Sequence, residues 1–266
     1  MVRSMKPDQK HADDKIWRYM SLAKFISLLS RSALWFTRAD TFEDKWEGLS
    51  RAIPYPRRED EATLDERYKK CIQIHAKWRR ALPRRSFVNC WTFKADSIPM
   101  WRIYGSYDGG IAVQTSVERF RQSVQFPKQC PARTMGPVRY YDSVPPYAFD
   151  YTKRVDFSWQ KEFELILQKR SGYSFEEEWR AVIVGSPSDT ARGTGIWVPV
   201  SSINDLIERV LVSPLAPNWF LSDVTALAKT LNLRATPEPS EFAQPRPRQN
   251  PAFSRRHGSS QAVRSR

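Results

Sequence analysis

The amino-acid sequence predicts an α+β fold, in which a mixed, largely antiparallel sheet is flanked by helices. Short apolar segments typical of strands alternate irregularly with amphipathic segments typical of helices, which argues against a regular βαβ array. The chain has 266 residues, of which 41% are hydrophobic, so it can bury a large core. We therefore expect a single domain at residues 15–235, preceded by a flexible N-terminus at residues 1–14.

The spacing of the apolar residues places the elements along this domain. Strands are expected at residues 16–19, 33–37, 86–93, 110–115, 138–141, 181–184, 196–200 and 210–213. Helices are expected at residues 22–31, 61–81, 99–104, 117–124, 155–169 and 218–231. Ser21 is the expected N-cap of the first helix, because its hydroxyl can accept a hydrogen bond from the first turn.

The C-terminal segment has a different composition. From residue 236 proline is frequent, apolar residues are few and arginine is in excess. Such a segment cannot bury enough apolar surface to fold, so residues 236–266 are expected to form a disordered, basic Pro/Arg-rich tail. At most this tail would add non-specific electrostatic affinity for a partner.

The charge of the chain indicates the kind of partner. It carries 43 Lys and Arg against 29 Asp and Glu, a formal net charge of +14. A strongly basic protein favours polyanions, and nucleic acid is the first candidate. Within the folded part, basic residues are densest at residues 57–85. This run is either the solvated face of a helix or a surface that faces nucleic acid.

The composition also excludes several classes of protein. No apolar run reaches the roughly 18 residues that span a bilayer, and residues 1–14 lack a signal-peptide core, so we expect no membrane partner and a cytoplasmic protein. Cys71, Cys90 and Cys130 have the spacing of neither a disulfide framework nor a zinc site. Three histidines in polar or charged segments disfavour hydrolases with a histidine base. The sequence contains no Gly-rich phosphate loop.

An acidic strand is the most informative segment. Three consecutive glutamates at residues 176–178 run into the apolar residues 181–184. Because side chains alternate along a strand, Glu176, Glu178 and Arg180 would share one face. The opposite face would carry Trp179, Ala181 and Ile183. Carboxylates at the start of a core strand in a basic protein form either a salt-bridged strand edge or part of a functional site.

Aromatic residues accompany polar ones at the ends of several other elements. These clusters lie at residues 42–48, 90–92, 100–105 and 110–113. Loops at element ends carry binding residues on a rigid scaffold. Aromatic walls with a few polar groups are what a pocket for a planar ligand requires. The clusters are therefore expected either to line one shared cleft or, residue by residue, to pack in the core.

The order of these motifs resembles a family of bacterial and phage proteins known mainly as a domain of unknown function. The residues that carry the resemblance are Trp17-Arg18-Tyr19, Leu34-Trp35-Phe36, Phe42 to Gly48, Cys90-Trp91-Thr92, Met100 to Tyr104, Gly110 to Val113 and Glu176 to Arg180. They span roughly residues 16–235 in the same order. Two residues depart from the family pattern, since Glu43 replaces an Asn and Lys45 a Pro.

A more distant resemblance is to ADP-ribosyltransferases, which carry a basic residue on an early strand, Ser or Thr on a middle strand and Glu-x-Glu on a later one. It implies an NAD-dependent enzyme, and such an activity would suit a toxin or phage-defence role. The basic surface of the chain would present this enzyme to nucleic acid. Glu178 would be catalytic, stabilising positive charge on the ribose, and Glu176 would orient the acceptor. The implied NAD-binding residues are Arg18, Tyr19, Thr92, Trp101 and Tyr104. The implied substrate-binding residues are Asp44, Glu47 and Arg180.

Alternatives remain at three points. Thr115-Ser116 competes with Thr92 for the middle-strand position. A Mg²⁺-dependent nuclease could use Asp44, Glu47 and the Glu-x-Glu pair as oxygen ligands, whereas the main hypothesis needs no metal. A non-catalytic nucleic-acid-binding or regulatory module would use the glutamates only to pair with neighbouring cations such as Arg180.

Overall fold

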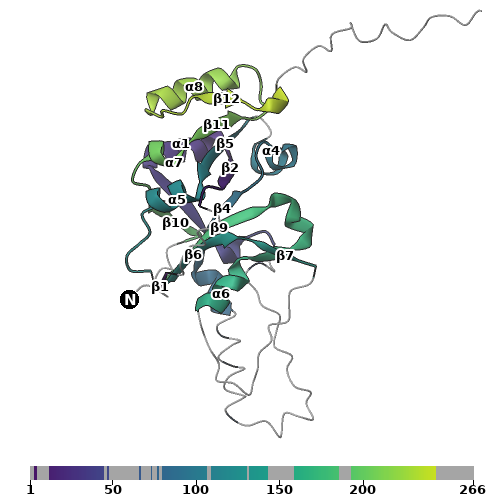
Figure 1. The fold of residues 1–266 in the computed structure, drawn as a ribbon, viewed down its shortest axis with the longest axis vertical. Coiled ribbons are helices and arrows are strands. Elements are labelled where there is room, and N and C mark those ends of the chain that lie inside the picture. The colour runs from purple at the N-terminus through teal and green to yellow at the C-terminus, as the bar shows by residue number, and fades with distance from the viewer. Residues whose placement is uncertain are drawn as a thin grey trace, which may run out of the picture.

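The computed structural model describes residues 3–4, 12–44, 47, 66, 73, 77, 80–106, 109–130, 132–142, 159–185 and 193–243. It confirms the predicted fold class, because the described residues form a large, mixed, mostly antiparallel sheet with helices packed on it (Figure 1). No helix in this part of the chain is long and apolar enough to cross a membrane.

The strands and helices occur in irregular alternation along the chain. The strands are β1 (Arg3–Ser4), β2 (Lys15–Ser21), β3 (Ala33–Arg38), β4 (Ser86–Thr92), β5 (Gly110–Ser116), β6 (Ala132–Pro137), β7 (Arg139–Tyr141), β8 (Gln168–Arg170), β9 (Glu178–Val184), β10 (Gly195–Pro199), β11 (Arg209–Val212) and β12 (Pro237–Pro239). The α-helices are α1 (Leu22–Arg31), α4 (Ile98–Tyr104), α5 (Val117–Ser123), α6 (Trp159–Ile166), α7 (Ile203–Leu206) and α8 (Phe220–Thr230). Short 3-10 helices are η2 (Ala39–Thr41), η3 (Ser171–Glu176) and η5 (Glu241–Ala243).

The main sheet forks at β4. Its strands follow the order β1-β6-β9-β4-β2-β5-β11-β12, and β3 joins β4 while pairing with β10. One edge of β4 pairs with β9 along its whole length. The other edge pairs with β3 at Val88 and with β2 at Thr92. Because β2 and β3 share one edge of β4, they diverge between these two residues. β7 and β8 form a separate parallel pair.

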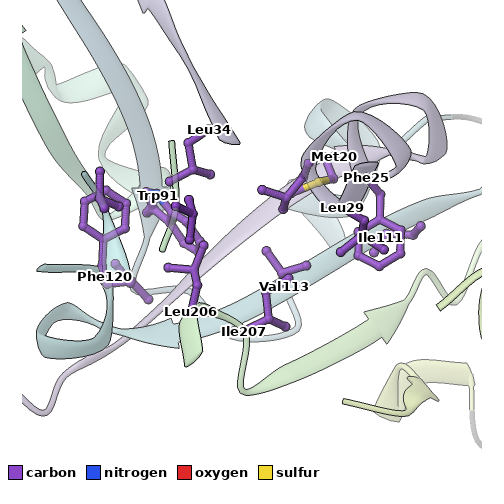
Figure 2. Close-up of a cluster of buried hydrophobic side chains, with 14 of the residues drawn as sticks. Met20, Phe25, Leu29, Leu34, Trp91, Ile111, Val113, Phe120, Leu206 and Ile207 are labelled. Atoms are coloured by element: carbon purple, nitrogen blue, oxygen red, sulfur yellow. The ribbon is translucent and has the colours of Figure 1, made fainter. Parts of the chain in front are cut away.

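The largest hydrophobic core gathers side chains from the sheet and from helices α1, α5 and α8. Figure 2 draws part of this cluster and labels, among others, Trp91 on β4 and Phe120 on α5. The Phe120 ring meets Trp91 edge to face at 5.7 Å between centroids and Trp179 at 5.1 Å. Edge-to-face pairs of this kind add to the stabilisation from burial. This core fixes the strands that present the polar residues described below.

The alternation predicted for the acidic strand is confirmed over β9. Trp179, Ala181 and Ile183 are in the largest core cluster, and Val182 and Val184 pack in a second cluster on the other face. Glu176 precedes the strand, at the end of η3, and Glu177 adopts the left-handed region with φ 40°. The two glutamates therefore do not share a strand face, although both side chains point to one cation, as shown below.

Two glycines allow α4 to pack against the start of β5. A Cβ atom on Gly110 would lie 2.7 Å from the Cα atom of Gly105, closer than real contacts allow. Gly105 ends α4 and Gly110 begins β5, so their backbones can meet only without side chains. This contact fixes α4, which carries Tyr104, against the sheet.

Several predicted boundaries differ from the structure. Each expected strand is present, and the helices expected at residues 22–31, 99–104, 117–124 and 218–231 are confirmed with shifts of at most two residues. Ser21 occupies the N-cap position of α1 but its side chain makes no capping hydrogen bond. The helix expected at residues 155–169 ends at 166, because residues 168–170 pair with β7 as a strand. The helix expected at residues 61–81 lies mostly outside the described residues.

Paired strands lie outside the expected domain, residues 15–235, at both ends. Residues 237–239 form β12, which pairs in parallel with β11, so the folded chain continues past the expected boundary at residue 235. Proline lacks a backbone N–H donor, but an edge strand tolerates it because one side of that strand has no partner strand to bond. At the other end, residues 3–4 pair with β6. The remainder of the predicted tail, residues 244–266, lies outside the described residues.

Candidate functional site

A cavity of about 300 Å³ opens where β2 and β3 diverge from each other along one edge of β4. Its walls are formed by residues of β2, α1, β3, β4, α4, β8, η3 and β9, and by residues 42–44 and 47, which follow η2. It collects nine of the ten residues that the sequence predicted for the site: Arg18, Tyr19, Asp44, Glu47, Thr92, Tyr104, Glu176, Glu178 and Arg180. These residues are distant in the chain, so the fork in the sheet is what brings them together.

Arg180 is the centre of a buried ionic network on one wall of this cavity. Its side chain is 1% exposed and contacts Glu178 at two points, Nε to Oε1 at 2.9 Å and Nη2 to Oε2 at 2.7 Å. Nη2 also donates to Glu47 at 2.6 Å, and Nη1 donates to the Ile166 carbonyl at 2.7 Å. Paired contacts of guanidinium with carboxylate are among the strongest in proteins. Arg180 therefore holds Glu178 in a fixed position.

Lys169 is a second cation in the network, and the sequence did not predict it as a site residue. Its ammonium nitrogen lies 2.7 Å from Glu176, 3.2 Å from Glu47 and 3.5 Å from Glu178. Burial acts to lower the pKa of Lys169, but the carboxylates of Glu178 and Glu47 raise it above its ordinary value. Lys169 is therefore charged. Three carboxylates and two cations leave the network with one net negative charge.

The two glutamates of the Glu-x-Glu motif have pKa values shifted in opposite directions. Burial raises the pKa of Glu176, against the opposing effect of Lys169. Burial is the largest effect on Glu178 and acts in the same direction, but Arg180 and Lys169 together outweigh it and hold the pKa of Glu178 below its ordinary value. Environments that separate two carboxyl pKa values distinguish a proton-exchanging group from a permanently ionised one. Glu176 is the better placed of the two to exchange a proton.

The hydrogen bonds received by each glutamate separate their roles further. A carboxylate offers about four acceptor positions. Glu178 receives two bonds from Arg180 and one from Lys169. Glu176 receives one from the Tyr104 hydroxyl at 2.8 Å and one from Lys169 at 2.7 Å. Glu176 therefore keeps more capacity to accept a hydrogen bond from a ligand than Glu178 does.

Arg18 provides positive charge on the opposite side of the fork. It lines the cavity from β2, is half-buried, and makes no hydrogen bond or ion pair with any described residue. Burial lowers the pKa of Arg18 to about 10, which still leaves it charged at neutral pH. A partly buried cation without a counter-ion is costly, so an anion is the complementary ligand. Lys24, which is exposed, lines the same cavity.

Aromatic side chains complete the cavity wall. Tyr19 and Tyr104 line it from β2 and α4, and Tyr173 lines it from η3. The Tyr19 hydroxyl donates to the Lys94 carbonyl at 3.1 Å and accepts from the Ser97 amide at 2.9 Å, while burial raises its pKa to about 12. These contacts hold the Tyr19 ring in place in the cavity wall.

Trp101 is the one predicted site residue that does not reach the cavity. It is 0% exposed and meets Tyr19 edge to face at 4.8 Å between centroids. Its indole nitrogen donates to Asp96 at 2.8 Å. Trp101 is therefore not available to stack on a ligand and instead supports Tyr19 from behind, which leaves Tyr104 as the aromatic wall on α4.

Asp96 links this wall to the C-terminal segment. Besides the Trp101 indole, its carboxylate accepts from the Ser240 hydroxyl and the Glu241 amide, each at 2.7 Å. Asp96 itself adopts the left-handed region with φ 35°, which closes the turn that contacts the Tyr19 hydroxyl. The chain beyond the predicted boundary thus braces one wall of the cavity.

The Thr92 side chain holds the backbone of Glu176 and Lys94 in position. Its hydroxyl donates to the carbonyl of Glu176 and accepts from the Lys94 amide at 2.9 Å. The competing pair Thr115-Ser116 does not line the cavity, since Thr115 is fully buried and Ser116 caps α5. Of the two candidates for the middle strand, Thr92 is the one at the site.

The carboxylates considered for a metal are occupied by cations of the protein. Asp44 pairs with Arg170 at 3.0 Å, and Glu47, Glu176 and Glu178 contact Lys169. In the part of the chain that the structure describes, no group of three or more His, Cys, Asp or Glu is arranged to hold a metal ion. Comparison with protein-family models, curated proteins and solved structures finds no match, so the site itself has to indicate the function.

Proposed function

We propose that this protein is an ADP-ribosyltransferase-like enzyme that binds NAD in the cavity and transfers ADP-ribose to an acceptor, with nucleic acid as the acceptor class. The observation that carries the proposal is one row of residues across three neighbouring strands. Trp17 on β2 pairs with Thr92 on β4, and Thr92 pairs with Glu178 on β9. Arg18, next to Trp17, faces the same cavity as Thr92 and Glu178.

The two charged ends of the cavity suit a dinucleotide with a cationic ring. Arg18 has no ion-pair partner in the part of the chain that the structure describes, and guanidinium groups bind phosphate oxygens well. The Glu176 end carries one net negative charge and is bordered by Tyr104 and Tyr173. Aromatic faces and negative charge both attract the positively charged nicotinamide ring. The volume of about 300 Å³ is at the lower end for small-molecule pockets and suits the nicotinamide-ribose half of the ligand.

The chemistry follows from the difference between the two glutamates. NAD, when bound, supplies a ribose–nicotinamide bond whose cleavage builds positive charge on the ribose carbon. Glu178, kept ionised by Arg180, contributes fixed negative charge near that carbon. Glu176, whose pKa is raised, takes the proton that the acceptor hydroxyl releases as it joins the ribose. Tyr104, hydrogen-bonded to Glu176, orients that carboxylate.

A non-catalytic nucleic-acid-binding module is the second candidate, and the closed ionic network favours it. Both glutamates of the motif already have cation partners within the protein. Buried carboxylates with such partners are common in purely structural networks. Arg18 has no ion-pair partner among the described residues and suits a phosphate of either NAD or nucleic acid, so release of nicotinamide, and not this cation, distinguishes the candidates.

Release of nicotinamide from NAD tests the enzyme proposal. The wild-type protein should release it with water or an oligonucleotide as acceptor. Glu176→Gln should lower the rate by about 100-fold or more while NAD still binds, since this is the usual contribution of a general base. Lys229→Ala, an exposed change on α8, serves as the control. No release by the wild type with any acceptor would leave the non-catalytic candidate.

A further inference from the structure

The proposed dinucleotide is larger than the cavity. A volume of about 300 Å³ suits the nicotinamide-ribose half, so the adenosine half has to lie on the surface next to the cavity. The residue of β3 that lines the cavity is Thr37. Thr37 pairs with Val88 of β4 on one side, which also lines the cavity, and with Gly195 of β10 on the other side. Thr37 therefore marks the border between the cavity and the outer strand β10.

Beyond this border the sheet carries two tryptophan rings. Because side chains alternate along a strand, Trp35 and Thr37 share one face of β3. A Cβ atom on Gly195 would overlap the Trp35 ring, so this ring lies across Gly195, one strand spacing or about 5 Å from Thr37. Trp35 is directly opposite Trp197 in the register and meets it at 5.1 Å between ring centroids. The aromatic pair thus continues the sheet surface that begins at Thr37.

Packing in the hydrophobic core does not account for the second of these rings. Val198 on β10 is buried in the largest core cluster, and Ile196 packs against that cluster. Trp197, between them, points to the opposite face and is 41% exposed. Its ring is therefore available to a ligand, with the half-buried Trp35 ring supporting its edge.

The elements around the two rings carry only positive charge. The segments α1, β3 and β10 contain Lys24, Arg31 and Arg38 and no Asp or Glu. Arg38 pairs with Asp40, whereas the side chains of Lys24 and Arg31 make no ion pair or hydrogen bond with a described residue. The Arg31 guanidinium lies over the Trp197 ring, 4.9 Å from its centroid. Lys24, which lines the cavity, is seven residues before Arg31 and so lies on the same face of α1, about 10 Å along the axis.

We propose that Trp35, Trp197 and Arg31 form a purine subsite that binds the adenine base of the dinucleotide. The base stacks on the exposed Trp197 ring, and the Arg31 guanidinium donates to nitrogen atoms of the purine. The phosphates extend back along α1 towards Lys24 and Arg18, which both line the cavity. The charges fit this orientation, because the cavity is lined by five carboxylates and four cations and receives the cationic ring.

This inference rests on the proposed function for the identity of the ligand. ADP carries the purine and the two phosphates but no nicotinamide, so its binding is measured without any reaction. Absence of ADP binding and absence of nicotinamide release are therefore separate results, and either can occur without the other.

The test is isothermal titration calorimetry with ADP and with nicotinamide mononucleotide, which has no purine. The wild type should bind ADP, and Trp197→Ala should weaken this binding by about 5- to 150-fold, the usual range for losing one stacked base. Arg31→Ala should weaken it by about 10-fold or more, as expected for a hydrogen bond from a charged donor. Neither change should alter the affinity for nicotinamide mononucleotide by more than about twofold, since that ligand does not reach the subsite.

Two matched controls separate this subsite from a general effect of exposed tryptophan or arginine. Trp219→Ala removes a 61% exposed tryptophan at the start of α8, and Arg234→Ala removes an exposed arginine. Both should bind ADP like the wild type, and thermal melts should show all four variants folded. The proposal is wrong if the wild type does not bind ADP, if Trp197→Ala and Arg31→Ala match their controls, or if they weaken nicotinamide mononucleotide as much as ADP. A single-stranded oligonucleotide that binds more tightly than ADP and depends on Trp197 would also overturn it and assign the rings to nucleic acid.

Discussion

Replacing Lys169 with methionine removes the charge at the centre of the carboxylate network while keeping an unbranched side chain. Lys169 contacts Glu176, Glu47 and Glu178 at 2.7, 3.2 and 3.5 Å. In the variant, Glu47 and Glu178 would still have Arg180. Glu176 would keep only the Tyr104 hydrogen bond. One buried carboxylate therefore loses its counter-ion.

The expected loss of stability follows from the one buried carboxylate that is left without a counter-ion. Removing one partner of a buried ion pair costs about 3–5 kcal/mol. Because the Tyr104 hydrogen bond remains, we expect a loss near the lower limit, about 3 kcal/mol in the free energy of unfolding at neutral pH. For a protein of this size, such a loss lowers the melting temperature by roughly 6–12 °C.

The loss should depend on pH with a definite sign. Without Lys169, the pKa of Glu176, already raised by burial, rises further in the folded state. A carboxyl group with a raised folded pKa favours folding below its unfolded pKa, and this advantage is lost as pH rises through the folded pKa. The deficit of the variant relative to the wild type should therefore shrink as the pH falls from neutral towards about 5.

Urea denaturation of the wild type, Lys169→Met and Lys169→Arg measures this directly. The arginine variant keeps the charge and should recover most of the stability. Lys229→Met, an exposed change on α8, should stay within about 0.5 kcal/mol of the wild type. A Lys169→Met variant as stable as this control, or one whose deficit grows as the pH falls, would refute the role given to Lys169.

Three further results are expected. Asp96→Ala removes an acceptor shared by three donors and should lower the free energy of unfolding by about 2 kcal/mol, with partial recovery in Asp96→Asn; unchanged urea curves would contradict the bracing of the cavity wall. Gly110→Ala places a Cβ atom 2.7 Å from Gly105 and should cost about 1–3 kcal/mol in thermal melts. The pKa of Glu178 is lowered in the folded state, so the stabilisation it gives is present above its ordinary pKa of 4.5 and is lost as the pH falls through the lower folded pKa. Glu178→Gln should therefore remove this loss of stability at acid pH, followed by circular dichroism. The same dependence of stability on pH in the variant and the wild type would contradict this role of Glu178.

The sequence predicted the site residues better than the contacts among them. Alternation along residues 178–184 correctly separated Trp179 from Arg180, because the period of a strand is read directly from the sequence. Trp101 was expected at the ligand and lies in the core, because an aromatic residue at an element end looks the same in both positions. Its direction depends on how α4 packs on β5, which one sequence does not show.

Lys169 could not be found from the sequence for a related reason. An amphipathic pattern at residues 155–169 predicted a helix, in which Lys169 would lie on the solvated face. The helix ends at Ile166, and pairing with β7 turns residues 168–170 into a strand that points Lys169 inward. Tertiary pairing overrides local periodicity in so short a segment. The position of Lys169 among three carboxylates therefore depends on strand pairing between distant segments, which the sequence does not show.

The same limit applies to the end of the domain. Proline-rich composition indicated a tail from residue 236, yet residues 237–239 pair with β11 and Ser240 is buried against Asp96. Composition indicates that this segment cannot fold by itself, whereas the edge of an existing sheet supplies hydrogen-bond partners for its backbone. The boundary was therefore set by β11 and Asp96, which no local pattern identifies.

Binding of NAD to the cavity is the most direct test of the proposed function, and tryptophan fluorescence can report it because Trp17 and Trp91 line the cavity. Arg18→Ala is the informative variant, since Arg18 has no ion-pair partner among the described residues and its loss should leave the fold intact. We expect a saturable change for the wild type and about 10-fold or greater weakening for Arg18→Ala, the effect of losing one charge-assisted contact to phosphate. A flat titration of the wild type, or equal affinity for the two proteins, would contradict the account.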